Sequence, residues 1–268
     1  MIIGNRNFEK GVDTYVMGIL NVTPDSFSDG GKYSTVEYAL KHVEQMINEG
    51  VDIIDVGGES TRPGYTKVSD TDEIDRVVPV IKAIKNRYDI PVSIDTYKSE
   101  VALAAIEAGA DMVNDIWGLK YDEKLADVIA DKGVACCIMH NRKEAQYTDL
   151  VSDVISDLQE SIDIAVKAGI SKDKIMLDPG VGFAKTYEDN LTIINNLPRI
   201  CDMGYPVLLG ASRKSVIGLT LDLPVTQREE GTLVTTVWAV QSGCDFIRVH
   251  NIESNKRAIK MSKAIIGR

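Results

Sequence analysis

Short runs of aliphatic and β-branched residues alternate along the chain with longer amphipathic segments. The apolar runs are four to six residues long, which is typical of strands buried on both faces of a parallel sheet. Six amphipathic segments end in a glycine directly before an apolar run. Glycine accepts the left-handed conformation that follows a helix without a Cβ penalty, so each marks a helix end. These glycines are Gly50, Gly109, Gly133, Gly169, Gly204 and Gly243.

The alternation predicts eight βα units of about 33 residues each, which favours the (β/α)8 TIM barrel within the α/β class. A doubly wound open sheet is the alternative, but strict alternation fits closure better. No linker or low-complexity tract interrupts the series, so residues 1–268 are expected to form a single domain. The expected strands cover residues 15–20, 52–57, 91–95, 112–116, 134–139, 175–178, 206–211 and 246–250. The expected helices cover residues 35–49, 72–88, 98–108, 122–132, 150–168, 187–203, 228–242 and 253–266.

Composition excludes several classes of protein. With 44% hydrophobic and 26% charged residues, the chain is ordinary for a globular protein with a large core. Its net charge of −10 argues against a partner with a nucleic-acid backbone or an anionic membrane surface. No apolar run approaches the ~18 residues of a transmembrane helix, and no signal peptide is apparent. The four cysteines lack metal-ligand spacing, so we expect reduced thiols in a cytoplasmic protein.

Polar side chains stand at the end of nearly every expected strand. In a (β/α)8 barrel the active site lies at these carboxyl ends. Any one of the residues could be a helix cap or a turn former, but the whole set predicts a binding site. The residues are Asn21, Asp55, Glu59, Asp95, Asn114, Asp115, His140, Asp178, Ser212, Lys214, Arg248 and His250.

Two kinds of ligand chemistry follow from these positions. Arg248 and His250 share one face of the last strand with Phe246, because side chains alternate along a strand. A guanidinium binds phosphate with two parallel hydrogen bonds, so this pair predicts an anion site, to which the helix start at residues 210–215 adds N–H donors. Acceptors at three other strand ends suit a flat heterocycle that offers an NH₂ group beside a ring N–H. Those acceptors are Asp95, Asn114 and Asp178.

The first two βα connections are unusually long. Residues 21–33, with Phe27 at the apolar tip, are a candidate lid, and residues 57–70 form a second long loop. Neither loop carries a nucleotide-phosphate motif, and the chain lacks a nucleophile elbow and a pair of histidines at zinc spacing. Asn21 could ligate Mg²⁺ together with substrate phosphates, since Mg²⁺ sites often use few protein ligands.

Seven blocks of the sequence together resemble, in the same order, the signature segments of the dihydropteroate synthase family. The resemblance covers nearly the whole chain, and its most specific parts are the first two blocks and GASRK (210–214). It implies a transferase that condenses 6-hydroxymethyl-7,8-dihydropterin pyrophosphate with p-aminobenzoate in folate biosynthesis. It also implies a homodimer and a target of sulfonamides. The blocks are MGILNVTPDSFSDGG (17–31), DIIDVGGESTRPG (52–64), PVSIDTYK (91–98), NDIWG (114–118), LDPGVGFAK (177–185), LLGASRKSVIG (208–218) and RVH (248–250).

The resemblance also implies roles for individual residues. The pterin site would comprise Asp95, Asn114, Met139, Asp178, Phe183, Gly210, Lys214 and Arg248. The pyrophosphate and its Mg²⁺ would be held by Asn21, Arg248 and His250, with Asn21 as the metal ligand. The p-aminobenzoate site would comprise Phe27, Asp29, Thr61, Arg62, Pro63, Lys214 and Ser215. The catalytic residues would be Asp95, Asp178, Lys214, Arg248 and His250.

Two departures from the family pattern and two other functions stay open at this point. Asn251 stands where many family members have Asp, and the less uniform segment after the fifth strand leaves the role of His140 undecided.

One alternative function is methyl transfer from methyltetrahydrofolate, which would share the pterin acceptors but need neither long loop. The other is a non-catalytic pterin-binding paralogue, which should lack loop or anion-site residues that this chain has.

Overall fold

The strands and helices of the computed structural model follow the expected alternation. The model describes residues 1–22, 32–59 and 67–267, and the side chains of residues 32–35 are outside the description. The barrel strands are β3 (Tyr15–Asn21), β4 (Ile53–Gly57), β5 (Val92–Asp95), β6 (Met112–Asp115), β7 (Ala135–Met139), β8 (Ile175–Asp178), β9 (Leu208–Leu209) and β10 (Phe246–Val249). The helices are α1 (Lys32–Asn48), α2 (Asp70–Arg87), α3 (Ser99–Glu107), α4 (Leu125–Lys132), α5 (Leu150–Ala168), α6 (Tyr187–Asn195), α7 (Leu197–Cys201), α8 (Ser215–Leu221), α9 (Glu229–Ser242) and α10 (Ile252–Ile266).

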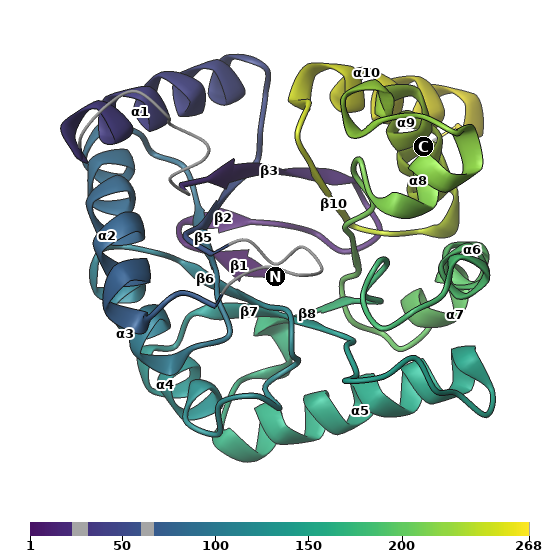
Figure 1. Ribbon diagram of the computed structural model, residues 1–268, viewed down its shortest axis with the longest axis horizontal. Helices are drawn as coiled ribbons and strands as arrows, with labels where there is room; N and C mark the ends of the chain where they lie inside the picture. The colour runs from purple at the N-terminus through teal and green to yellow at the C-terminus, as the bar shows by residue number, and fades with distance from the viewer. Residues whose placement is uncertain (23–31, 60–66, 268) are drawn as a thin grey trace.

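The eight strands form one parallel sheet that closes on itself. Their order is β8-β7-β6-β5-β4-β3-β10-β9. A parallel bridge between Leu177 and Val207 joins the two edges. The helices surround this sheet as an outer ring (Figure 1). The predicted (β/α)8 barrel is therefore confirmed.

Two elements differ from the prediction because of proline. The expected helix over residues 187–203 is divided at Asn196 into α6 and α7. Pro198 has no N–H to donate to the carbonyl of Ile194, and the indole N–H of Trp238 binds that oxygen instead, at 2.9 Å. The seventh barrel strand is also shorter than expected, because Pro206 cannot donate at its beginning and only Leu208–Leu209 pair with β10.

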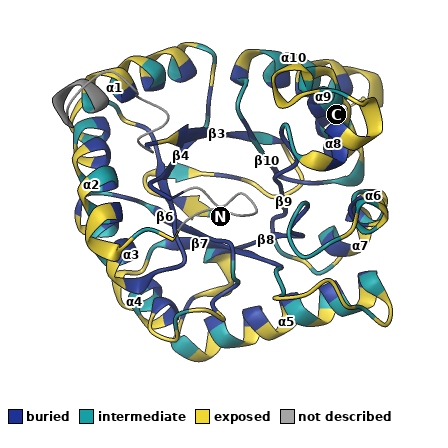
Figure 2. Ribbon diagram, viewed as in Figure 1, coloured by how far each residue is buried: buried dark blue, intermediate teal, exposed yellow. Residues whose placement is uncertain are grey.

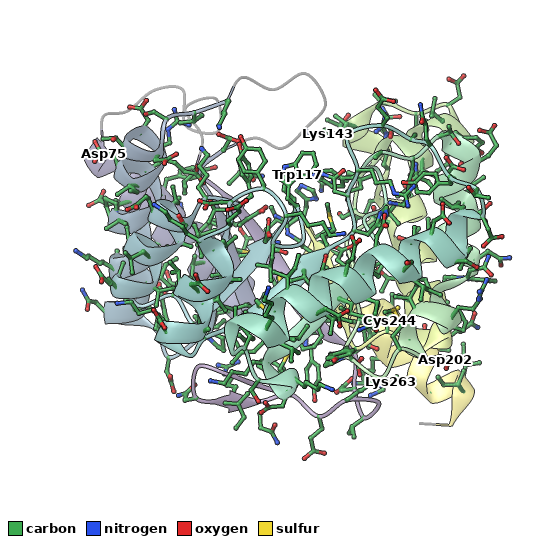
Figure 3. All side chains as sticks on the ribbon, turned by 90° about the horizontal axis from the view of Figure 1, so that it is seen from below. Asp75, Trp117, Lys143, Asp202, Cys244 and Lys263 are labelled. Atoms are coloured by element: carbon green, nitrogen blue, oxygen red, sulfur yellow. The ribbon has the colours of Figure 1, made fainter. Side chains whose placement is uncertain are left out.

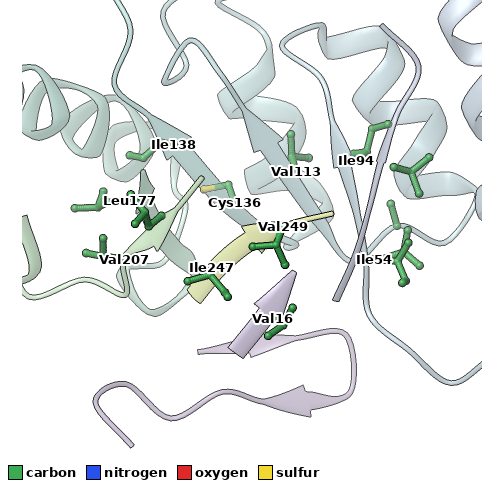
Figure 4. Close-up of a cluster of buried hydrophobic side chains, with 14 of the residues drawn as sticks. Val16, Ile54, Ile94, Val113, Cys136, Ile138, Leu177, Val207, Ile247 and Val249 are labelled. Atoms are coloured by element: carbon green, nitrogen blue, oxygen red, sulfur yellow. The ribbon is translucent and has the colours of Figure 1, made fainter. Parts of the chain in front are cut away.

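Side-chain alternation along the strands separates two apolar layers. The outward residues, among them Val16, Ile54 and Val113, pack between the strands and the helices (Figure 4). The inward residues, among them Met17 and Met176, fill the amino-terminal half of the barrel. Figure 2 shows the barrel strands buried along most of their length, with exposed residues mainly on the outer helices and the loops.

A short hairpin that the sequence analysis did not predict closes one end of the barrel. It consists of β1 (Ile2–Ile3) and β2 (Arg6–Asn7), which pair antiparallel. Ile3 and Phe8 are buried in the inward layer, and the Phe8 ring lies 5.5 Å from that of Phe246. Figure 3 shows the hairpin at the opposite end of the molecule from Trp117, which lies at the carboxyl ends of the strands. A ligand can therefore reach the barrel interior only from the carboxyl side.

Two expectations from composition can also be compared with the structure. The four cysteines are unpaired, as expected, and the sulfur atoms of Cys201 and Cys244 are 3.9 Å apart, too far for a disulfide. Cys201 is half-buried, and the other three are buried. Among the described helices, none is both long enough and apolar enough to cross a membrane.

Candidate functional site

A layer of polar side chains lies inside the barrel above the inward apolar layer. The register places Asp95 beside Asn114, and Asn114 beside Cys137. Period-2 alternation carries β4, β6, β8 and β10 from an apolar inward residue to a polar one, as from Phe246 to Arg248. The strands therefore turn the closed barrel into a cup with an apolar floor and a polar ring. The inward polar residues are Asp55, Asp95, Asn114, Asp178 and Arg248.

Arg248 is the centre of this ring. Its Nε donates to Asp55 Oδ2 at 2.6 Å, and its Nη2 donates to Asp95 Oδ2 at 2.5 Å. Asn114 Nδ2 donates to the same Asp55 oxygen at 3.3 Å, which leaves the Asn114 carbonyl oxygen as the acceptor side of its amide. The side chain of Asp55 is fully buried and that of Asp95 is 8% exposed. One guanidinium thus compensates two buried carboxylates.

The charges in this ring are not fully balanced. Burial raises the pKa of Asp95 to about 7 although the Arg248 charge opposes the shift, and the Asp55 charge adds to it. Burial alone would lower the pKa of Arg248, but Asp55 and Asp95 raise it, so the guanidinium stays charged. Within the described residues, Asp55 Oδ1 and Asp95 Oδ1 are buried without a hydrogen-bond partner. Buried polar atoms are nearly always paired, so these oxygens are candidates to accept hydrogen bonds from a ligand.

Two further charged side chains, Asp178 and Lys214, lie where β8 and β9 end, and each influences the charge of the other. A Cβ atom on Gly210 would lie 3.3 Å from Asp178 Oδ2 and 3.9 Å from Lys214 Nζ, so this glycine leaves room between the two charges. Burial lowers the pKa of Lys214 to about 8, against the effect of Asp178. Burial also raises the pKa of Asp178, against the effect of Lys214. Both pKa values are therefore shifted toward neutrality, and each group can form hydrogen bonds with a ligand.

Apolar side chains form the wall above the polar ring. Tyr97, Ile116 and Met139 are buried together, and Trp117 and Phe183 pack against them. The Phe183 ring lies 4.6 Å from Lys214 Nζ. A flat ring that entered between this wall and the ring of acceptors would have apolar faces and hydrogen-bonded edges.

The predicted anion residues lie beside each other after β9 and β10. Ser212 Oγ and His250 Nδ1 are 2.9 Å apart, and the backbone N–H of His250 points to the same hydroxyl, at 3.4 Å. The next residue, Asn251, is the N-cap of α10 and accepts a hydrogen bond from Ser254 N at 3.1 Å. Asp and Asn are both good caps, so the departure from the family at this position leaves the local fold unchanged.

The structure brings most of the predicted site residues to one cup, with two differences. Arg248 was expected to face an anion, but two of its nitrogens are bound to Asp55 and Asp95. Within the described residues its Nη1 makes no hydrogen bond. Ser215 is the exposed first residue of α8, directly after Lys214. Five predicted residues lie outside the described residues: Phe27, Asp29, Thr61, Arg62 and Pro63.

Two residues of the site received no role from the sequence. Asp55 was noted as a polar strand end, but its pairing with Arg248 depends on three-dimensional closure. Lys185 stands at the end of the block LDPGVGFAK and binds His140 Nδ1 at 2.8 Å. His140 itself is buried and points to Lys185 and Asp157. The sequence signal that could have indicated Lys185 is its position as the last residue of the family-like block LDPGVGFAK.

The described residues suit a metal ion that arrives with a substrate, but not a resident metal ion. No group of three or more His, Cys, Asp or Glu side chains in the described ranges could hold a metal ion. Asn21 is exposed at the end of β3, and a Cβ on Gly57 would lie 3.7 Å both from its Oδ1 and from Asp95 Cβ. One amide oxygen beside a carboxylate suits Mg²⁺ that arrives with a substrate phosphate, but not a resident ion.

The chain is similar to proteins of known name over nearly its whole length. The family described as pterin binding enzyme matches residues 17–250. A dihydropteroate synthase of Clostridium beijerinckii is 58% identical over 269 residues, covering all of both chains.

Solved structures agree with this comparison. The structure of the Clostridium difficile dihydropteroate synthase, determined in the presence of pteroic acid, is similar with a TM-score of 0.94 and 48% identity, over 97% of this chain and 99% of the other. The Xanthomonas albilineans dihydropteroate synthase with 4-aminobenzoic acid gives a TM-score of 0.91 at 42% identity, over 96% and 95% of the two chains.

Replacing the central guanidinium should destabilise the fold in a pH-dependent way. Arg248→Met leaves two buried carboxylates without a cation, which should lower the free energy of unfolding by about 3–5 kcal/mol at pH 8. In the wild-type protein Asp95 takes up a proton as the pH falls through about 7, after which its pairing with Arg248 contributes less stability, so the loss in the variant should be smaller at pH 5.5. Urea denaturation at both pH values measures the difference.

The matched control is Lys132→Met, which removes an exposed ion pair with Glu107. It should change the free energy of unfolding by no more than about 0.5 kcal/mol at either pH. An Arg248→Met variant as stable as this control at pH 8 would contradict the interpretation of the ring.

Proposed function

The chain belongs to the dihydropteroate synthases of the pterin-binding enzyme family, which are transferases, and we propose that its polar cup carries the reaction of that family. The substrates are 6-hydroxymethyl-7,8-dihydropterin pyrophosphate and p-aminobenzoate, and the products are 7,8-dihydropteroate and pyrophosphate. The observation that supports these residue roles is the ring of buried acceptors and Lys214 beneath one apolar wall.

The pterin binds flat against the apolar wall. Its amino group and ring N–H donate to carboxylate and amide oxygens of Asp95, Asn114 and Asp178, two of which end neighbouring strands. Lys214 donates to an oxygen or nitrogen acceptor of the ring, and Asp178 compensates its charge. Met139 and Phe183 contact the faces of the ring, and Gly210 leaves the space for its edge. This set of donors and acceptors recognises the ring and fixes its orientation.

The pyrophosphate lies at the mouth of the cup. His250, Ser212 and the unbound Nη1 of Arg248 supply donors there. Because Arg248 is held by two carboxylates, it keeps its position and its charge while the leaving group departs. Preorganised donors of this kind stabilise developing negative charge without reorganisation during the reaction.

The reaction starts by cleavage of the bond between the pterin methylene carbon and the pyrophosphate oxygen. The electron pair leaves with the pyrophosphate, and the positive charge that remains is spread over the electron-rich dihydropterin ring. The carboxylates of Asp95 and Asp178 stabilise this cation through the ring N–H groups. No side chain forms a covalent bond with the substrate.

The aniline nitrogen of p-aminobenzoate then attacks the methylene carbon with its lone pair, forms the C–N bond and loses a proton to the released pyrophosphate. A neutral aniline needs orientation more than activation, so the enzyme contributes mainly proximity. We assign orientation of the carboxylate end to Ser215 with Lys214 at the start of α8, and to the residues of the two long loops. The proposed loop residues are Phe27, Asp29, Thr61, Arg62 and Pro63.

The pterin acceptors can be tested one at a time. Asp178→Asn keeps the size of the side chain but removes the charge that stabilises the cation, and Lys214→Ala removes the compensating donor. Each should lower kcat/KM by about 10²–10³-fold or more. The measurement is pyrophosphate release that requires both the pterin substrate and p-aminobenzoate.

The control for this experiment is Asp173→Asn, an exposed aspartate just before the other end of β8, which should keep the wild-type rate. Pyrophosphate release that does not depend on the amine would contradict the proposed reaction. A near-normal rate in both pterin-site variants would contradict the assignment of these residues.

We also propose that Mg²⁺ enters with the pyrophosphate. Asn21 would supply one oxygen ligand, and the phosphate oxygens would supply others. Bound in this way, the ion would add positive charge next to the leaving group. The position of Asn21 beside Asp95 at the mouth of the cup supports this role.

Calorimetry distinguishes this arrangement from a resident metal site. Mg²⁺ alone should give no measurable binding to the protein, whereas Mg²⁺ should tighten binding of pyrophosphate. Asn21→Ala should reduce that effect without changing the affinity for pyrophosphate in the presence of a chelator. Tight binding of Mg²⁺ without pyrophosphate would contradict the proposal.

A homodimer is the proposed assembly. Large apolar side chains are exposed on α8, α9, α10 and the turn between α8 and α9, and α9 packs against both other helices. Large exposed apolar areas mark protein interfaces. The proposed interface is therefore this face of the molecule. Its residues are Leu219, Leu221, Val225, Val234, Trp238, Met261 and Ile265.

Charge placed in this face should separate the subunits. Val234 is 67% exposed on α9, and Val234→Glu should convert a dimer into a monomer in sedimentation velocity at micromolar concentration. Val166→Glu is the control, since Val166 is 39% exposed but lies on α5, which is not one of the helices of this face. A wild-type monomer, or a dimer that survives the substitution, would contradict this interface.

A cytoplasmic location completes the proposal. Its support is the set of four unpaired thiols, since oxidising compartments favour disulfides.

A further inference from the structure

The loop that follows β8 is held in shape by two lysines. Lys185 Nζ donates to the carbonyl oxygens of Gly180 and Phe183, each at 3.1 Å. Lys214 Nζ donates to the carbonyl oxygen of Val181, between them, at 2.5 Å. Three carbonyl oxygens of the loop backbone thus accept hydrogen bonds from ammonium groups. This loop carries Phe183, which belongs to the apolar wall of the cup.

The backbone of this loop is unusual enough to need such support. Gly180 and Gly182 have φ angles of 70° and 84°, and Ala184 has 43°, which is in the left-handed region that a residue with a Cβ rarely adopts. A Cβ atom on Gly180 would lie 1.9 Å from the carbonyl oxygen of His140, so the loop rests directly on that residue. Tyr147 adds one hydrogen bond from its hydroxyl to the Ala184 carbonyl, at 2.7 Å.

Lys185 has an acceptor for each of its three N–H bonds. Besides the two carbonyls it donates to His140 Nδ1 at 2.8 Å. Since Nδ1 accepts, the proton of the neutral imidazole is on Nε2, which donates to Asp157 Oδ2 on α5 at 3.0 Å. Asp157 is in turn fixed by Arg142 Nε at 2.5 Å. A continuous chain of hydrogen bonds therefore runs from α5 to the loop.

The pKa shifts of His140 and Lys185 agree with the direction of these hydrogen bonds. Burial, followed by the charge of Lys185, lowers the pKa of His140 to about 3, so the imidazole stays neutral. Burial lowers the pKa of Lys185 to about 7, while Asp178, Asp189 and Asp157 act in the opposite direction and Lys214 adds to the shift. The ammonium is thus present at neutral pH but is lost easily as the pH rises.

We propose that Lys185 is a positioning residue for the pterin site, which acts through the carbonyls of Gly180 and Phe183 and is itself oriented by His140 and Asp157. It touches no substrate. It fixes the position of the Phe183 ring and of the Val181 carbonyl, which binds Lys214. The pterin ring therefore contacts Phe183 and Lys214 at fixed positions. The inference rests on the proposed function for the identity of the ligand.

The decisive variant is Lys185→Met, which keeps the length of the side chain and removes its donors. KM for the pterin pyrophosphate should rise about tenfold to a hundredfold, because a wall displaced by about 1 Å binds the ring poorly. The KM for p-aminobenzoate and kcat should change less than about threefold, as expected for loss of binding that is equal in ground and transition states. Lys185→Arg, which keeps a charged donor, should recover part of the loss.

The matched control is Lys120→Met. Lys120 donates to the backbone carbonyl of the same Asp157, at 3.0 Å, but makes no contact with the loop. It should leave all three constants at their wild-type values. An equal change in both methionine variants, or an equal rise in the KM values of both substrates for Lys185→Met, would overturn the proposal in favour of a general effect on stability.

Amide hydrogen exchange gives a readout that does not depend on turnover. Residues 180–185 should exchange faster in Lys185→Met than in the wild-type protein or in Lys120→Met, while β8 stays protected. An unchanged exchange rate would overturn the proposal whether or not the chain has the proposed activity. His140→Phe, which removes one acceptor of Lys185, should shift exchange in the same direction, and it serves as the second variant if Lys185→Met does not fold.

The pH dependence separates positioning from packing. In the wild-type protein, exchange of residues 180–185, corrected for the intrinsic pH effect, should increase as the pH rises through about 7, because Lys185 loses one donor. In Lys185→Met this step should be absent. A step of the same size in both proteins would assign it to another group and overturn the role of Lys185.

Discussion

The pairing of one guanidinium with two buried carboxylates is the constraint on which the rest of the site depends. Asp55 and Asp95 lie on neighbouring strands, inside a barrel whose floor is apolar, and Arg248 is the cation that binds both. Among the residues that the structure describes, one oxygen of each carboxylate has no hydrogen-bond partner. A structure that only needed stability would fill these positions with apolar residues of similar volume. The polar ring is therefore better explained by ligand binding than by folding.

The closed end of the barrel makes this arrangement effective. Ile3 and Phe8 cover the inward apolar layer, so water reaches the polar ring from the carboxyl side alone. Once a flat ligand covers that side, the hydrogen bonds in the cup lie in a medium of low dielectric constant, where they are stronger than in water. The same burial brings the pKa values of Asp95 and Lys214 toward neutrality. The unpredicted hairpin thus contributes to the chemistry at the opposite end.

The sequence predicted the features that follow from the periodicity of strands and helices. It missed the contacts that form only when the barrel closes. Alternation along a strand was sufficient to place Arg248 on the inward face with Phe246. It could not show that Arg248 meets Asp95, because that contact joins strands β10 and β5 across the curved sheet. The strands of the hairpin have two residues each, too few for a periodic signal. Pro198 indicates the division between α6 and α7, but the long amphipathic run around it led to the prediction of one continuous helix.

Lys185 shows why the remaining part of the site could not be read from the chain. It stands in an irregular loop, 45 positions from His140 along the sequence, and no helical or strand period relates the two. What relates them is the packing of α5 against the barrel, which brings Asp157 under His140. The site is thus built from two kinds of contact. Inward strand residues present the groups proposed to meet a ligand, while the outer helix and the loop set the shape of the wall. A change in the helical layer can therefore alter the proposed pterin site without touching it.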